Sequence, residues 1–63
     1  MTRSEVMAAI MNYHEVAVAK AIEEGEDPGS FDLPGARMYY EELTDWDLVE
    51  YYNFLKDQRL LPS

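Results

Sequence analysis

The sequence contains no cysteine and a single histidine, His14. A disulfide and a thiolate-ligated metal centre are therefore excluded, and one imidazole cannot build a zinc site alone. A chain of 63 residues without such supports hides only about 60% of the surface that it exposes when unfolded. We therefore expect a single small domain over residues 1–63 that gains further stability by association, with a second copy or with another molecule.

Long apolar runs are absent as well. No stretch approaches the roughly 18 apolar residues that cross a membrane, and Met1–Ser4 lacks the basic and then apolar start of a secretory signal. We expect a cytoplasmic protein, located in the host cytoplasm if a phage encodes it. The net charge of −8 argues against direct binding to nucleic acid or to anionic membranes, because both are polyanions.

Basic residues are scarce, and the acidic residues are segregated. Ten of the 13 carboxylates lie between Glu23 and Glu50, where Arg37 is the one base, so this window carries a net charge of −9. Concentrated like charge weakens a compact state. The arrangement therefore calls for an explanation such as a basic partner or a need for solubility.

Residue combinations that would support catalysis are few. Serine occurs three times, and no serine or threonine has an obvious base partner in the sequence. A glycosidase-type pair of carboxylates needs a cleft that so short a chain rarely forms, and there is no glycine-rich phosphate loop. The acidic run at 23–32 lacks the residue order of a calcium loop. We predict a protein that is not an enzyme and has no metal or cofactor.

Helix signals begin at the N-terminus. Thr2 and Glu5 form a capping box, helix-forming residues continue to Glu24, and Gly25 stands where a left-handed C-terminal residue belongs. The apolar residues of this helix cover about half of its circumference, whereas one packed neighbour needs a stripe only a little over 100° wide. We therefore expect this helix to have more than one neighbour.

The second half predicts two shorter helices. A connector with two proline–glycine steps covers residues 24–35. Pro34 suits the first turn of a short helix over residues 36–43. Thr44 then begins a last helix that should run to about Arg59, with aspartates at its positive end.

These signals predict an all-α fold: a long N-terminal helix, a Pro/Gly connector, a short helix and a C-terminal helix packed back as a helical hairpin. An alternative stays open for residues 30–40. If the chain turns at Pro34 and Gly35, these residues form two strands, and the fold is α+β with a helix–β-hairpin–helix order.

A cluster of carboxylates with one tryptophan flanks Thr44. Two turns of helix interrupted there could present charges at spacings like those of a nucleic-acid duplex, which carries about one negative charge per 1.7 Å. Such a surface would occupy a basic groove by mimicry, whereas the ordinary interpretation is a solvated face with acids favoured at a helix start. The candidate partner-binding residues are Glu41, Glu42, Asp45, Trp46, Asp47 and Glu50.

The apolar arc of the first helix is a second candidate surface. His14 projects from its middle, where it is either a pH switch or a neutral, hydrogen-bonded side chain in a core or symmetric interface; we favour the second. We expect a homo-oligomer, with a dimer as the default symmetry. The candidate oligomer interface consists of Met7, Ile10, Met11, His14 and Val18.

Two resemblances bear on function. The opening MTRSEVMAA, the stretch SFDLPGARMYY and the run T-D-W-D-L together resemble the small phage head–tail joining proteins of the lambda W type. That resemblance implies a helix–hairpin–helix fold with strands over Ser30–Tyr40. Separately, ELTDWDLVEYY is similar to a stretch of the Hha-type nucleoid modulators, which implies a partner that itself binds DNA.

The sequence as a whole predicts a non-catalytic, acidic protein-binding module. Its acidic second half would dock on a basic protein surface and inhibit a nucleic-acid-handling machine, as small phage-encoded antagonists of host defence or transcription do. One alternative is a structural component of a virion, head–tail joint or scaffold, which would bind through apolar faces. Another is an oligomer that sequesters a small molecule such as a nucleotide near Tyr13, His14 and Lys20.

Overall fold

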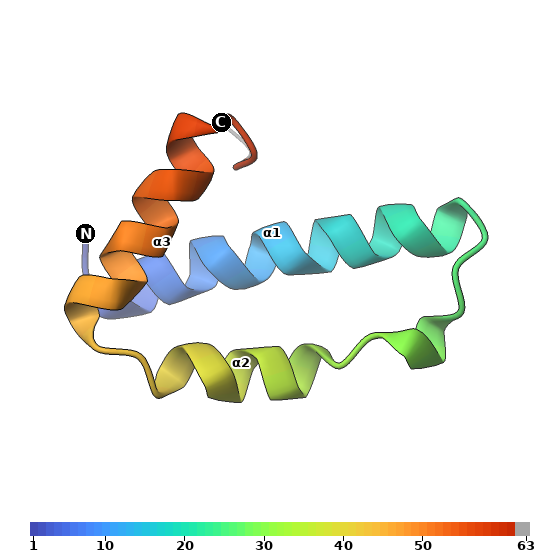
Figure 1. The fold of residues 1–63 in the computed structure, drawn as a ribbon, viewed down its shortest axis with the longest axis horizontal. Coiled ribbons are helices and arrows are strands. Elements are labelled where there is room, and N and C mark those ends of the chain that lie inside the picture. The colour runs from blue at the N-terminus through green and yellow to red at the C-terminus, as the bar shows by residue number, and fades with distance from the viewer. Residues whose placement is uncertain (62–63) are drawn as a thin grey trace.

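The computed structural model describes residues 1–61 and contains three α-helices (Figure 1). Helix α1 spans Arg3–Glu23, α2 spans Leu33–Glu41 and α3 spans Asp45–Asp57. A 3-10 turn, η1, covers Pro28–Ser30 within the connector. There is no strand in the described part of the chain, so the all-α prediction is confirmed.

The two ends of α1 form as their residues predict. The Thr2 hydroxyl accepts the backbone N–H of Glu5 at 3.2 Å, and the Glu5 carboxylate accepts the Thr2 N–H at 3.3 Å. The backbone and side-chain hydrogen bonds from Thr2 lower the pKa of the Glu5 carboxyl. At the other end, Gly25 has a φ of 108°, and its N–H donates to the Ile22 carbonyl at 3.0 Å. This geometry closes the helix in the way that glycine favours.

Residues 33–41 are helical, so the helix–β-hairpin–helix alternative is wrong. The Asp32 carboxylate accepts the Gly35 N–H at 2.9 Å and caps α2, while Pro34 in the first turn already has a helical φ. Gly35 permits this approach, because a Cβ there would collide with the Asp32 side chain. With this cap α2 begins at Leu33, earlier than the predicted residue 36.

The core lies along the N-terminal half of α1. Helix α2 runs back beside this half and α3 crosses it at a steep angle, while the C-terminal half of α1 extends past both (Figure 1). The broad apolar arc of α1 therefore has two neighbours, as expected. The buried core residues are Val6, Met7, Ile10 and Met11 of α1, Tyr40 of α2, and Leu48 and Leu55 of α3.

Helix α3 begins as predicted and ends earlier. The Thr44 hydroxyl accepts the Asp47 N–H at 3.2 Å. The last helical residue is Asp57, because Arg59 adopts a left-handed backbone with a φ of 58° and the Leu60 N–H returns to the Leu55 carbonyl at 3.0 Å. An L-residue pays roughly 1–2 kcal/mol for this conformation. Pro62, a residue type that cannot continue a helix, lies outside the described residues.

We predict that Arg59→Gly stabilises the protein by about 0.5 kcal/mol. Glycine adopts a positive φ without steric cost, and its greater freedom in the unfolded chain offsets part of the gain. Urea denaturation measures the change in the free energy of unfolding. The control is Gln58→Gly, where φ is −80°, and it should destabilise. Equal losses for the two variants would contradict the prediction.

Candidate functional site

The six predicted partner-binding residues lie together where α2 ends and α3 begins. The link between these helices has three residues, 42–44, so the last turn of α2 and the first turns of α3 are close in space. All six residues are exposed. We call this surface the acidic corner; it consists of Glu41, Glu42, Asp45, Trp46, Asp47 and Glu50.

Two carboxylates of the acidic corner are already paired with bases. Asp45 accepts from the Arg3 guanidinium, and Glu41 accepts from Arg37 Nε at 3.2 Å one helical turn away. Within residues 1–61, no base lies at ion-pair distance from the remaining three, Glu42, Asp47 and Glu50. The unpaired charge of the corner therefore faces solvent.

Trp46 is the exposed apolar residue of the corner. Its side chain is 71% exposed, and Val49, one turn further along α3, is 42% exposed. Leu48 and Leu55 are buried on the opposite side of the same helix, so α3 has one buried face and one exposed apolar face. Tryptophan is large enough to be well buried in most proteins, and it is enriched among the residues that carry binding energy at interfaces.

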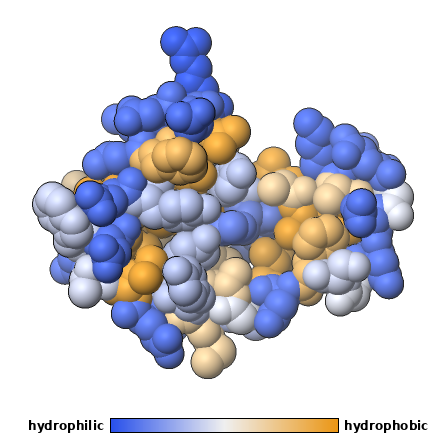
Figure 2. Space-filling model, viewed as in Figure 1, coloured by the Kyte–Doolittle hydropathy of each residue, from blue (hydrophilic) through white to orange (hydrophobic). Residues whose placement is uncertain are grey.

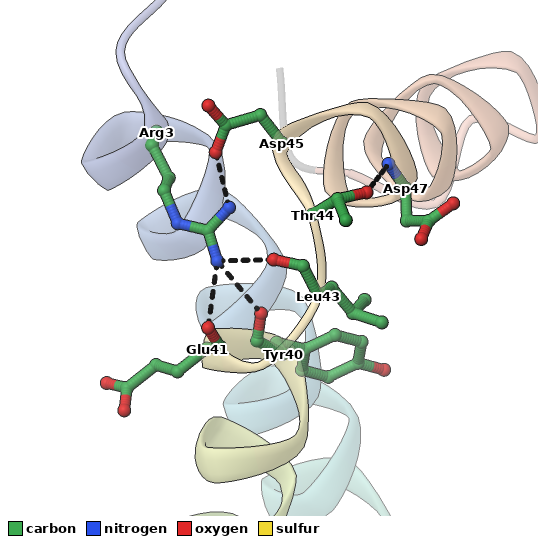
Figure 3. Close-up of polar contacts among 7 residues, drawn as sticks. All are labelled: Arg3, Tyr40, Glu41, Leu43, Thr44, Asp45 and Asp47. Atoms are coloured by element: carbon green, nitrogen blue, oxygen red, sulfur yellow. Dashed lines mark hydrogen bonds and ion pairs between the residues drawn. The ribbon is translucent and has the colours of Figure 1, made fainter.

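Arg3 fixes the position of the acidic corner (Figure 3). From the first turn of α1, its guanidinium donates to the carbonyls of Glu41 at 2.9 Å and Leu43 at 2.7 Å, and to the Asp45 carboxylate. Carbonyls at a helix C-terminus carry partial negative charge and lack partners within the helix. One cation thus satisfies the end of α2 and the start of α3. Sequence reasoning missed this role, because the partners lie about 40 residues away in the chain.

We predict that Arg3→Gln lowers the free energy of unfolding by about 2 kcal/mol, since it removes several hydrogen bonds to a charged group. The matched control is Arg37→Gln. Arg37 makes one exposed pair within α2, which contributes about 0.3 kcal/mol. Urea denaturation of both variants checks the difference. Similar losses in the two would show that Arg3 is an ordinary surface ion pair.

His14 lies in a row of aromatic side chains that joins the helices. Its Nε2 is 2.9 Å from the hydroxyl oxygen of Tyr40, and Tyr40 stacks on Tyr51 with ring centroids 5.3 Å apart. Tyr40 is 8% exposed and His14 is half-buried. The geometry therefore matches the interpretation of His14 as a hydrogen-bonded packing residue. It reaches this state within one chain, without a symmetric partner.

The structure divides the candidate oligomer interface. Met7, Ile10 and Met11 are buried under α2 and α3 of the same chain, so their apolar character does not require a second copy. Val18 lies in the C-terminal half of α1, which extends past α2 and α3, and is half-buried. Self-association remains a prediction, and a surface for it would have to consist of residues other than Met7, Ile10 and Met11.

The residues proposed to hold a small molecule do not converge within one chain. Tyr13 and Lys20 line an open hollow of about 240 Å³ together with Val16, Ala17 and Leu60. His14 instead contacts Tyr40. His14 is not among the residues that line the hollow, although its ring contacts that of Tyr13.

Burial raises the pKa of the Tyr40 hydroxyl well above its ordinary value, and the neighbouring Tyr51 adds to this effect. The folded state therefore keeps a proton that the unfolded chain loses near pH 10. It follows that the contribution of Tyr40 to stability is complete below about pH 10 and is lost as the pH rises further.

We predict that Tyr40→Phe makes the free energy of unfolding less dependent on pH above about pH 10. The control is Tyr39→Phe, whose side chain is largely exposed. Urea midpoints measured in steps from neutral to alkaline pH give the slopes of the three proteins. A slope in Tyr40→Phe as steep as that of the unmodified protein would contradict the prediction, whatever its stability at neutral pH.

Comparison with known protein families, with curated proteins and with solved structures finds no match to this chain. No helix within residues 1–61 is long and apolar enough to cross a membrane. Among those same residues, no group of three or more histidine, aspartate or glutamate side chains is placed to hold a metal ion.

Proposed function

We propose that this chain is a non-catalytic protein-binding module whose acidic corner docks on a basic surface of a partner protein. The observation that carries the proposal is the position of Trp46. Its exposed ring lies in the same surface as carboxylates that have no base within reach. Tryptophan would supply an apolar anchor, and the carboxylates would steer a basic partner and fix its orientation.

The charge distribution over the fold supports the same proposal. The chain places ten of its 13 carboxylates between residues 23 and 50. Two of its five bases, Arg3 and Arg37, already pair at the corner, and the surface there remains acidic. A partner that brings lysine and arginine side chains would relieve this repulsion. Within residues 1–61, the fold uses none of the Glu42, Asp47 and Glu50 carboxylates in an ion pair, so we attribute their charge to binding.

Basic surfaces of this kind are typical of proteins that handle nucleic acid. A module that covers such a surface competes with the phosphates that would bind there. We therefore propose that the chain inhibits a nucleic-acid-handling protein in the cytoplasm, as a phage-encoded antagonist of host defence or transcription would.

A second candidate function is assembly through apolar surfaces, as in a structural or scaffold protein. The C-terminal half of α1 favours it, because Val16 is 56% exposed and lines a hollow together with Leu60. Apolar residues gather on the side of the molecule that holds this half of α1 (Figure 2). A surface of this kind would associate with little dependence on salt.

We predict that reversing two unpaired charges, Glu42→Lys with Glu50→Lys, abolishes partner binding at low salt. The control, Glu15→Lys with Glu23→Lys, makes the same change in net charge at exposed positions of α1 and should bind like the unmodified protein.

Trp46→Ala should weaken binding about thirtyfold, the effect of a hot spot of about 2 kcal/mol.

The measurement uses the immobilised proteins and a cell lysate, at about 0.1 M and about 1 M salt, where the Debye length falls from about 10 Å to about 3 Å. Mass spectrometry identifies what each variant retains. Proteins kept by the unmodified chain and the control, but lost with the corner variant and at high salt, support the proposal. Retention of the same proteins by the corner variant would refute it, and salt-independent retention would favour assembly through apolar surfaces.

A further inference from the structure

An open hollow with aromatic walls adjoins the acidic corner. It has a volume of about 410 Å³ and lies between α2, the link and α3. We call it the tyrosine hollow; its lining residues are Tyr39, Tyr40, Leu43, Asp47 and Tyr51. It shares Asp47 with the acidic corner, so a partner that docks on the corner covers the hollow as well.

The rings of the tyrosine hollow present both edges and faces. Tyr39 and Tyr40 lie nearly perpendicular, at 78° with centroids 5.2 Å apart, whereas Tyr40 and Tyr51 are parallel within 14°. Tyr39 is 61% exposed, so its ring is accessible to a ligand. Aromatic faces attract cations that lie within about 6 Å of the ring centroid.

A carboxylate without a base stands at the same hollow. Asp47 is exposed and lies one helical turn before Tyr51 on α3. Figure 3 shows Tyr40, Leu43 and Asp47 projecting to one side of the link, with Arg3 on the opposite side. On the Arg3 side, a guanidinium binds the Leu43 carbonyl of the link and the Asp45 carboxylate. The tyrosine side also offers a carboxylate, together with aromatic rings, and in the described chain it has no base.

From this geometry we propose that the tyrosine hollow receives an arginine side chain of the basic partner. The guanidinium stacks on a tyrosine ring and donates to the Asp47 carboxylate, while the aliphatic stem lies against Leu43. Arginine fits better than lysine, because its planar group stacks on rings and donates to both oxygens of a carboxylate, whereas an ammonium is a strongly hydrated point charge. The inference rests on the proposed docking of the acidic corner and adds the residue that the partner must supply.

The test uses two peptides of equal charge as probes: an octapeptide of alternating glycine and arginine, and its lysine analogue. Isothermal titration calorimetry at about 0.1 M salt gives the two dissociation constants and their ratio for each variant. Chemical shifts of the tyrosine ring protons locate the bound peptide. The variants are Tyr39→Leu and Asp47→Asn.

Each variant has a matched control on α3. Phe54→Leu removes a ring of similar exposure that does not line the hollow, and Asp57→Asn removes a carboxylate far from it. We expect Tyr39→Leu to weaken the arginine peptide about threefold and the lysine peptide less, consistent with one exposed cation–π contact. Asp47→Asn should weaken the arginine peptide more than Asp57→Asn does. The ring protons of Tyr39 and Tyr51 should shift with the arginine peptide.

The outcomes separate the two proposals. If both peptides bind but Tyr39→Leu leaves the ratio of their affinities unchanged, the hollow does not select arginine, and docking of the acidic corner stands. If Glu42→Lys with Glu50→Lys leaves the arginine peptide bound at the tyrosine rings, the hollow binds arginine without these two carboxylates, and the lysate experiment decides whether the acidic corner is the docking surface. Absence of arginine-peptide binding in the unmodified protein would overturn the inference, and the lysate experiment would then decide the proposed function by itself.

Discussion

The contact of Arg3 with the link between α2 and α3 is the interaction on which the rest of the structure depends. The Glu41 and Leu43 carbonyls lie near the Asp45 carboxylate, because one guanidinium binds all three. Without a cation, these groups repel one another and the end of the helix dipole adds to the repulsion. The Arg3 guanidinium lies among them and ties both helices to the first turn of α1. The corner thereby acquires a fixed shape in spite of its charge.

Polar groups in the interior are satisfied, and the charge imbalance is confined to the surface. No side-chain nitrogen or oxygen that is buried within residues 1–61 lacks a hydrogen-bond partner. His14 and Tyr40 satisfy each other, and the core around them is otherwise apolar. The excess of carboxylates therefore does not reflect a strained interior, since the fold would lose none of these internal contacts if the exposed acids were neutral. Such a separation leaves the charge of the acidic corner exposed to solvent.

Local signals in the sequence predicted the helices, but they could not predict contacts between residues far apart in the chain. Thr2, Gly25 and Thr44 mark helix ends through bonds to residues only a few positions away, so their pattern is visible in the chain. The end of α3 escaped prediction because arginine occupies a backbone conformation that usually indicates glycine. A helical wheel shows which side of α1 is apolar, but not which half of its length the other helices cover. Met7 was therefore assigned to an interface although it packs within one chain. The residues of the acidic corner lie together because they are close in the sequence, and their role in partner binding stays a prediction. The cation that orders the corner, Arg3, comes from the other end of the chain.

The two sides of the link suggest how binding and inhibition would be connected. On one side of the link, Arg3 of α1 binds the Asp45 carboxylate. On the other side, Asp47 and tyrosine rings line a hollow that is open to solvent. An arginine that contacts a nucleic-acid phosphate uses the same planar donors that a carboxylate would engage. A partner arginine held in the tyrosine hollow is then unavailable to phosphate, and the exposed carboxylates beside it repel an approaching strand. Inhibition would thus require no change in the shape of the partner. It would follow from occupying a few cationic side chains. A partner variant with lysine in place of those arginines would lose more affinity for this protein than for nucleic acid.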